Sequence, residues 1–298
     1  MNKPRYSILI IAAFFAIYFI WGSTYLLNKI VVTEAPPLML ASIRFISAAI
    51  LIFILARVMK LDLSVNKRQF INSVIAGFLF LSYGNGMFVW ALKYVDSGFA
   101  ALIASSQPLF VLVLMYLIHG KQIHLKSLIG VFLGLVGMYL LFIQQDLSPG
   151  GNNFLGIVMI LTCVLSWSYG SVFVAKAELP THFLVSTGYQ MLTGGILLIF
   201  GSIMVGEPWV SPLGWSPKAQ LSMFLLVIFG SIVAFTAFNY LLKVVSTEKV
   251  STSAFVNPVI ALILGSYVLD EKITAQSGVA ALILLTGVYF VNSRKRDF

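Results

Sequence analysis

The sequence predicts an all-α integral membrane protein whose ten transmembrane helices form two inverted five-helix repeats. Three observations lead to this fold class: an apolar composition, ten long apolar runs, and an internal repeat. Of the 298 residues, 59% are hydrophobic and 10% are charged, and the mean hydropathy is +0.97. Soluble domains are about 45–50% apolar and about 25% charged. Lipid is therefore the expected solvent for most of the chain, and an ordinary soluble enzyme is excluded.

Each apolar run is long enough to cross a bilayer, because a membrane-spanning helix needs about 20 mostly apolar residues. A short basic start, Lys3 and Arg5, makes the first run resemble a signal peptide. That run is too long, however, and no small-residue cleavage site follows it, so we interpret it as a retained span. The ten predicted spans cover residues 7–31, 37–59, 71–93, 98–118, 125–143, 154–175, 183–205, 220–243, 249–269 and 275–293.

The positive charge predicts how the chain is oriented. A net charge of +9 and a pI near 9.6 would suggest nucleic acid as the partner of a soluble protein. Here, 14 of the 19 lysines and arginines fall at the ends of one face if the N-terminus is cytoplasmic. Cytoplasmic loops of membrane proteins carry such an excess. We therefore expect both termini in the cytoplasm, anionic membrane lipid as a partner, and no nucleic acid.

The two halves of the sequence resemble each other at a spacing of 146 to 150 residues. RFISAAILIF at 44–53 matches QMLTGGILLI at 190–199, and Pro108 and Gly137 recur as Pro258 and Gly287. Five spans per repeat is an odd number, so the second copy must enter the membrane from the opposite side. Inverted repeats are common in secondary transporters, whose substrate sites lie near the bilayer midplane. The polar stretch at 144–153 predicts the boundary, which gives repeats at 1–148 and 149–298.

Two prolines lie near the middle of the fourth and ninth spans, and each follows an amide residue. Proline removes a backbone donor and frees the carbonyl four residues earlier, and in a membrane that carbonyl must be satisfied by protein or water. We interpret Pro108 and Pro258 as kink or gating positions. We interpret Ser105, Gln107 and Asn257 as candidate substrate contacts. The alternative is a kink that shapes the bundle without touching a substrate.

Arg44 is the one charged residue well inside a predicted span. It lies seven residues beyond Pro37, or about 10 Å along a helix, where exposure to lipid would be costly. One interpretation is a counter-charge for a substrate carboxylate or phosphate, since a guanidinium presents a planar fork of donors. The other is a side chain that snorkels to the surface or binds a nearby carbonyl.

Polar and aromatic residues concentrate in the first, third, sixth and eighth spans. Polar groups within spans usually face the bundle interior, although some serve as contacts between helices or as interfacial anchors. As a group they predict a polar and aromatic cavity. The residues are Trp21, Ser23 and Asn28, then Tyr83, Asn85 and Trp90, then Trp167 and Tyr169, and finally Asn239 and Tyr240.

The sequence also restricts the chemistry. It has no P-loop, its ten acidic residues fall in predicted loops or at span ends, and its lone cysteine, Cys163, has no metal-binding spacing. Proton-coupled carriers usually retain an intramembrane carboxylate or histidine. We therefore expect no cofactor, no metal, and facilitated export or exchange.

Several motifs resemble the EamA family of the drug/metabolite transporter superfamily. They are IWGSTY at 20–25, PPLMLASIRF at 36–45, the pairs QP at 107–108 and NP at 257–258, and DEKI at 270–273. The resemblance covers nearly the whole chain. It implies a ten-helix inverted-repeat fold in which helices 1, 3, 4, 6, 8 and 9 surround a central cavity, with amino acids or their analogues as frequent cargo.

The sequence therefore predicts a secondary transporter that exports small metabolites across a bacterial inner membrane by alternating access, not an enzyme. Two alternatives are a membrane-embedded enzyme acting on a lipid-linked substrate and a passive channel. Gly130, Gly134 and Gly137 have the small-residue spacing that allows close helix contacts. Those contacts would lie within the bundle or in a dimer, so both a monomer and a homodimer remain open.

Overall fold

The computed structural model describes residues 3–120, 125–143, 152–270 and 272–292. The predicted boundary between repeats, at 148 and 149, lies outside the described residues. Helices of the first half are α1 (Lys3–Phe15), η1 (Ala16–Ile20), α2 (Trp21–Val32), α3 (Pro37–Val58), α4 (Lys67–Gly77), η2 (Phe78–Asn85), α5 (Gly86–Ala91), α6 (Ser97–Ala104), α7 (Gln107–His119) and α8 (Leu125–Phe142). Those of the second half are α9 (Asn152–Lys176), α10 (Phe183–Met204), η3 (Pro212–Gly214), α11 (Pro217–Leu225), η4 (Leu226–Val233), α12 (Ala234–Val244), α13 (Thr247–Val250), α14 (Ser253–Leu269) and α15 (Ala275–Asn292).

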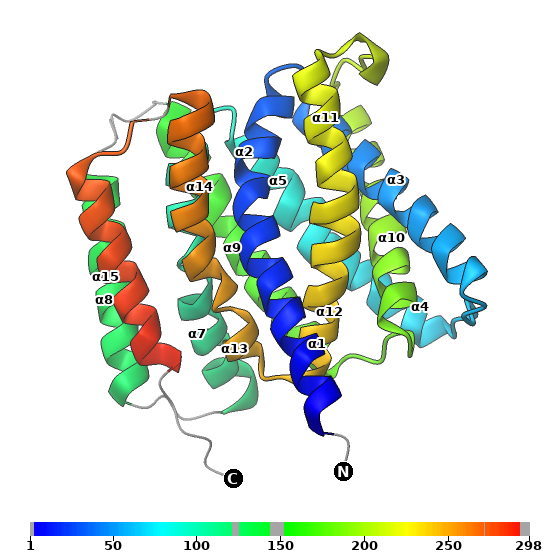
Figure 1. The fold of residues 1–298 in the computed structure, drawn as a ribbon, viewed down its shortest axis with the longest axis horizontal. Helices are drawn as coiled ribbons and strands as arrows, with labels where there is room; N and C mark the ends of the chain where they lie inside the picture. The colour runs from blue at the N-terminus through cyan, green and yellow to red at the C-terminus, as the bar shows by residue number, and fades with distance from the viewer. Residues whose placement is uncertain (1–2, 121–124, 144–151, 271, 293–298) are drawn as a thin grey trace.

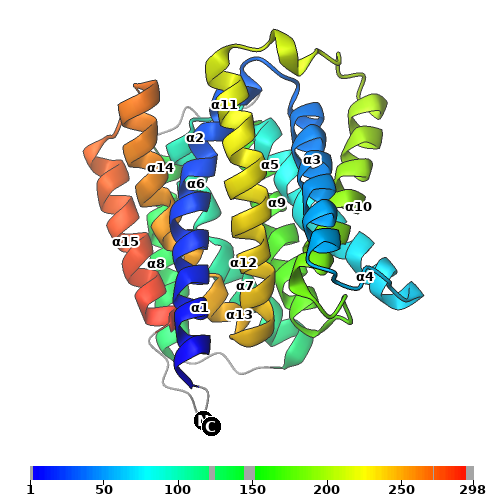
Figure 2. The same ribbon diagram turned by 45° about the vertical axis from the view of Figure 1, so that its right-hand side comes forward.

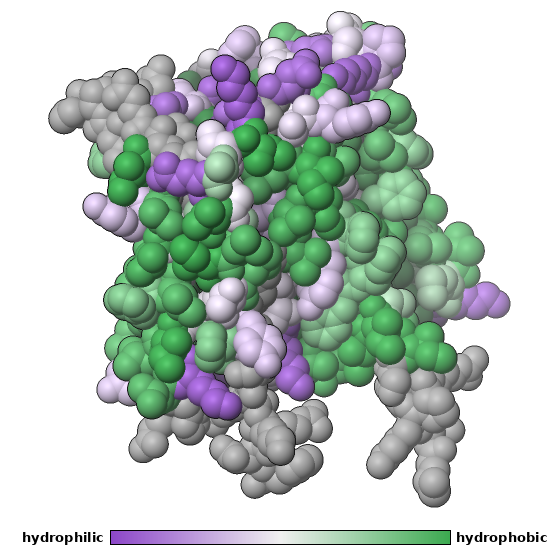
Figure 3. Space-filling view, turned by 60° about the vertical axis from the view of Figure 1, so that its left-hand side comes forward, coloured by the Kyte–Doolittle hydropathy of each residue, from purple (hydrophilic) through white to green (hydrophobic). Residues whose placement is uncertain are grey.

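The helices form a membrane-embedded bundle. Over the described part of the chain, seven helices are long and apolar enough to cross a membrane, and three shorter apolar helices accompany them at 128–137, 256–269 and 275–287. Large apolar side chains such as Phe132 and Leu282 face outward. Hydrophobic side chains form a broad band between more hydrophilic ends (Figure 3). The predicted all-α membrane fold is confirmed.

The bundle has two faces, which the chain ends distinguish. Lys3 at the start of α1 and Asn292 at the end of α15 lie on one side (Figure 1), which we call the terminal face. The loops at 33–36 and 205–216 lie on the other side, which we call the distal face.

Helix packing follows the internal repeat. The counterparts α3 and α10 pack along each other, as do α8 and α15 (Figure 2). The contact of α9 with α7 is matched by the contact of α2 with α14, and each of these contacts joins one half to the other. An apparent two-fold relation of this kind is what inverted repeats produce.

Glycines bring α8 and α15 into close contact. A Cβ added to Gly287 would meet the Gly130 carbonyl oxygen at 2.7 Å, and one added to Gly137 would meet Leu284 Cγ at 2.7 Å. The small residues noted in the sequence therefore pack within the bundle. Close contact between backbones stabilises helix pairs in lipid, where the hydrophobic effect does not drive helices together.

The fourth and ninth spans are broken before their prolines. α6 ends at Ala104 and α7 begins at Gln107, so Pro108 lies in the first turn of α7, where no backbone donor is needed. The Ser105 hydroxyl in the intervening turn donates to the Leu102 carbonyl at 2.6 Å. In the ninth span, the break falls between α13 and α14, and Pro258 lies inside α14.

In the described part of the chain, three spans contain π-helical segments that apolar periodicity did not predict. They are η1, η2 and η4, in the first, third and eighth spans. The last two occupy related positions in the two repeats. Wide turns of this kind are rare and often occur at functional sites.

Two carboxylates hold helix ends together at the distal face. Glu207 accepts hydrogen bonds from the Leu38 and Met39 backbone nitrogens at 3.0 and 2.8 Å, at the start of α3, where the helix dipole favours an anion. Glu34 accepts from the Ser216 hydroxyl and backbone nitrogen, just before α11. These two hydrogen bonds, the hydroxyl's first, lower the pKa of the Glu34 carboxyl.

We expect Gly287→Ala to destabilise the bundle, because its Cβ would collide with a backbone oxygen of α8. Overpacking of this kind costs about 1–3 kcal/mol. The matched control is Gly278→Ala in the same helix, where a Cβ meets nothing within 4 Å and alanine's helix propensity adds up to about 1 kcal/mol. Melting temperatures of the purified variants check this, and equal values would contradict the packing described above.

Candidate functional site: a central cavity

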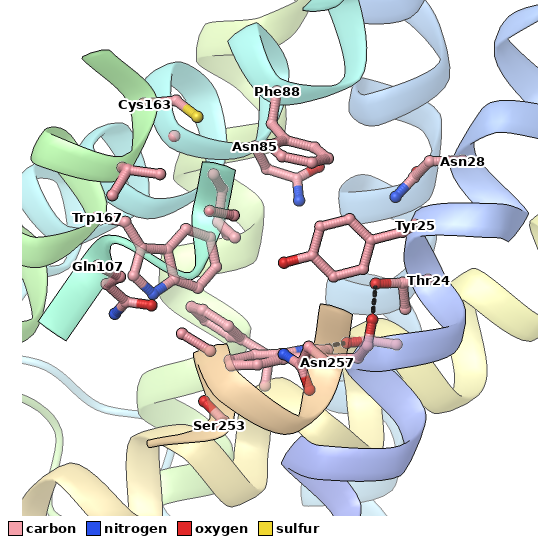
Figure 4. A pocket seen from close by; sticks show the side chains of 18 of the residues that line it. Thr24, Tyr25, Asn28, Asn85, Phe88, Gln107, Cys163, Trp167, Ser253 and Asn257 are labelled. Atoms are coloured by element: carbon pink, nitrogen blue, oxygen red, sulfur yellow. Dashed lines mark hydrogen bonds between the residues drawn. The ribbon is translucent and has the colours of Figure 1, made fainter. Parts of the chain in front are cut away.

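A cavity of about 800 Å³, including the open space at its mouth, lies between the two repeats. In the first span its lining extends from Trp21 to Asn28, four residues before the end of α2. The cavity thus extends from the bundle centre toward the distal face. Its polar and sulfur-containing lining residues come from six spans (Figure 4): Trp21, Thr24, Tyr25, Asn28, Arg44, Asn85, Gln107, Cys163, Trp167, Ser253 and Asn257.

Among the described residues that line the cavity, Arg44 supplies the one positive charge, and it is 3% exposed. Its Nε donates to the Ser231 hydroxyl at 2.8 Å, and its Nη1 contacts the Asn28 amide oxygen at 3.4 Å. The guanidinium carbon also lies 4.9 Å from the centre of the Phe45 ring. The side chains that the guanidinium contacts are therefore all neutral. Among the described residues, no carboxylate lies within ion-pair distance of it.

Gly230 in η4 allows α2 and α3 to approach the eighth span. A Cβ at this position would meet Thr24 Cγ2 at 2.9 Å and Arg44 Nη2 at 3.0 Å. The Gly230 carbonyl accepts a hydrogen bond from Trp21 Nε1 at 3.1 Å. The π-helical segment thus supplies an acceptor to an indole from the other repeat.

An aromatic cluster lies along the cavity, and its residues Trp21, Trp167 and Phe235 belong to the lining. Trp21 and Trp167, counterparts in the repeat, meet edge to face with centroids 5.6 Å apart. Phe80 lies 5.0 Å from the Trp167 ring, and Phe238 lies 4.9 Å from the Trp21 ring. Phe235 packs against Phe238 at 5.9 Å. We call these five residues the aromatic floor.

Two amide side chains of the cavity keep an unused acceptor. The Asn85 and Asn257 Oδ1 atoms are buried without a hydrogen-bond partner. Asn257 lies beside the Tyr25 hydroxyl, which points across the cavity (Figure 4). Deeper toward the terminal face, the Tyr18 hydroxyl and the Thr252 hydroxyl share a hydrogen bond of 2.6 Å, which joins the first span to the break in the ninth.

The structure brings together seven of the fourteen residues that the sequence assigned to substrate contact or to the cavity. The residues that line the cavity are Trp21, Asn28, Arg44, Asn85, Gln107, Trp167 and Asn257. In each half the amide before the proline, Gln107 or Asn257, reaches the cavity, whereas Pro108 and Pro258 do not line it.

The other seven candidates lie elsewhere. Ser23 donates to its own helix, Tyr169 is exposed, and Tyr83 and Trp90 are half-buried in the third span. Ser105 is buried beside the break in the fourth span. Asn239 and Tyr240 lie on α12, where Asn239 contacts α10.

Some residues that line the cavity were not predicted from the sequence, although their helical spacing from predicted residues places them on the same face. Thr24 and Tyr25 lie three and four residues after Trp21, on the face that ends at Asn28. Ser253 lies four residues before Asn257, and Cys163 four before Trp167. Phe88 and Phe235 are apolar and carry no signal that separates cavity from core. Among the described residues, no group of three or more histidine, cysteine or acidic side chains could hold a metal ion.

Comparison with known proteins identifies the family. The EamA-like transporter family matches this chain twice, over residues 8–143 and 154–293. The chain belongs to the EamA-like transporter family. It is thus a membrane transporter of the drug/metabolite type, as the motifs predicted.

Individual relatives of this EamA-like chain are also named as transporters. The uncharacterized inner membrane transporter YedA of Escherichia coli (strain K12) is 36% identical over 290 residues, which cover 96% of this chain and 91% of that protein. The uncharacterized transporter YoaV of Bacillus subtilis (strain 168) is 24% identical over 93% of this chain and 95% of its own.

A third relative, named as a probable amino-acid metabolite efflux pump of E. coli (strain K12), is 26% identical over 91% of this chain and 90% of its own. One crystal structure matches with a TM-score of 0.73 and covers 95% of this chain and 96% of its own. The sequence identity is only 17%, so this structure supports the fold of the chain and says nothing of its function.

Proposed function

We propose that the protein is an alternating-access carrier that exports small carboxylate-bearing metabolites, such as amino acids or their analogues, across a bacterial inner membrane. The observation that carries this proposal is the Arg44 guanidinium, which is buried at the cavity wall with neutral partners. A buried charge without a counter-charge is costly, and a carboxylate in the cavity would compensate it through paired charge-assisted hydrogen bonds.

The rest of the lining fits a small amphipathic solute. None of the described lining residues is acidic, so a cation without a carboxylate would gain no ion pair. The Tyr25 hydroxyl and the amides of Asn85, Gln107 and Asn257 offer neutral hydrogen-bonding groups. The aromatic floor offers a flat apolar surface for a side chain or a methylene group.

Export is supported by the relative named as an efflux pump, and the inner-membrane location by the name of YedA. Saturable counterflow in proteoliposomes tests the carrier proposal directly. Unlabelled solute on one side should drive labelled solute to accumulate from the other, which a passive channel would not do. If a broad panel of amino acids and their analogues gives no counterflow, the carrier proposal is wrong.

Arg44→Gln should raise the KM for carboxylate-bearing solutes about tenfold or more, because a hydrogen bond to a charged group contributes about 1.5–3 kcal/mol. The melting temperature should change little by comparison with the KM, since a neutral amide costs less to bury than a charge. The control is Arg57→Gln, an exposed position at the end of the same helix. Counterflow and melting temperature are measured together, and parallel loss of both would assign Arg44 to folding.

We also propose that the terminal face is cytoplasmic, as the lysine and arginine distribution predicts. Reporter domains fused to the C-terminus test this orientation. A cytoplasmic reporter should be active there and a periplasmic one inactive, and the reverse result would contradict the proposal.

A further inference from the structure

A second group of buried polar residues lies between α10 and α12, in the half of the bundle toward the terminal face. Gln190 Nε2 donates to the Asn239 amide oxygen at 3.2 Å, and Asn239 Nδ2 donates to the Thr187 hydroxyl at 3.1 Å. Thr236 and Tyr240 lie one helical turn apart on α12, before and after Asn239 in the sequence, and the Tyr240 ring lies 5.5 Å from the Phe183 ring of α10. We call Gln190, Thr236, Asn239 and Tyr240 the polar seam.

The polar seam is incompletely satisfied. Gln190 Oε1, the Thr236 hydroxyl and the Tyr240 hydroxyl are buried without a hydrogen-bond partner. Such groups are unfavourable in a membrane protein, where bulk water cannot replace the missing partner. The cavity has the same property at Asn85 and Asn257, and there a solute or water can fill the space. The unsatisfied polar atoms of the seam indicate a second conformation, in which water or a solute reaches the seam and forms the missing hydrogen bonds.

The internal repeat relates the seam to the cavity. Gln190 occupies the position in the second repeat that Arg44 occupies in the first. Both are buried, and both bind the eighth span, Arg44 at Ser231 and Gln190 at Asn239. Two inverted halves that exchange conformations would open a path beside Gln190 when the path beside Arg44 closes.

The eighth span connects the seam to the aromatic floor. Phe235 and Phe238 of α12 belong to the floor, and the next residues along the helix, Thr236 and Asn239, belong to the seam. A displacement of α12 away from α10 would therefore open the floor and expose the seam together.

We propose that the polar seam is the solute-binding vestibule of the terminal face, through which the solute reaches or leaves the cavity in the alternate conformation. This inference rests on the proposed carrier function. Because the vestibule has the neutral Gln190 in place of Arg44, it recognises a solute by amide and hydroxyl groups alone. It should therefore bind a carboxylate more weakly than the cavity does.

Thiol accessibility tests the vestibule. The variant Thr236→Cys is treated with a membrane-impermeant, charged methanethiosulfonate from each side of oriented vesicles, with and without a mixture of proteinogenic L-amino acids that omits cysteine, because its thiol would consume the reagent. Peptide mapping separates its labelling from that of the native Cys163, which reports on the cavity. Val233→Cys, partly exposed on the outer surface of the same span, is the matched control.

We expect Thr236→Cys to react several-fold faster than Val233→Cys, and only from the terminal face. The amino-acid mixture should change labelling at position 236 and at Cys163 in opposite directions. If Thr236→Cys is as unreactive as Val233→Cys while counterflow persists, the vestibule proposal is wrong and the carrier proposal stands. If counterflow is absent, both the carrier proposal and the vestibule proposal are wrong.

Removing the unpartnered hydroxyls gives an independent test. Thr236→Val and Tyr240→Phe should leave the melting temperature unchanged or higher, because no hydrogen bond is lost, but should slow counterflow several-fold. The control Thr193→Val removes a hydroxyl that contacts the Ser73, Tyr189 and Gln190 carbonyls, and it should lower the melting temperature. Unchanged counterflow in both seam variants would overturn the proposal.

Discussion

The burial of the Arg44 guanidinium is the constraint on which the arrangement of this bundle depends. A charge at this depth cannot face lipid without a large penalty, so α3 must turn this side chain inward and neighbouring helices must supply acceptors. Ser231 and Asn28 do so from the eighth and first spans. The position of one cation thus determines which helices meet at the cavity wall.

The eighth span meets this requirement through an irregular backbone. Gly230 leaves room for the guanidinium, and its carbonyl binds the Trp21 indole. Wide π-helical turns supply carbonyls that a regular helix would keep for itself. The matching segments in the third and eighth spans show that the irregularity belongs to the repeat, and both segments contribute to the lining of the cavity.

Much of the fold could be predicted from the sequence because lipid imposes strong rules. A span must be long and apolar, so the predicted ends of α3 and α10 agree with the structure to within a residue. The cavity was harder to predict, since polar residues in a membrane bundle either face a cavity or join helices. Asn85 does the first and Asn239 the second, and composition does not distinguish them. The π-helical segments had no sequence signal, because their apolar residues fit a regular helix equally well.

The proposed function depends on whether Arg44 makes the cavity a carboxylate site. The most direct measurement is the melting temperature of the purified protein with amino acids and with the corresponding carboxamides, because a ligand that binds the folded state raises it. Acids of suitable size should raise the melting temperature, their amides should not, and the difference should disappear in Arg44→Gln. Equal shifts from acids and amides in the unaltered protein would contradict a carboxylate site at Arg44.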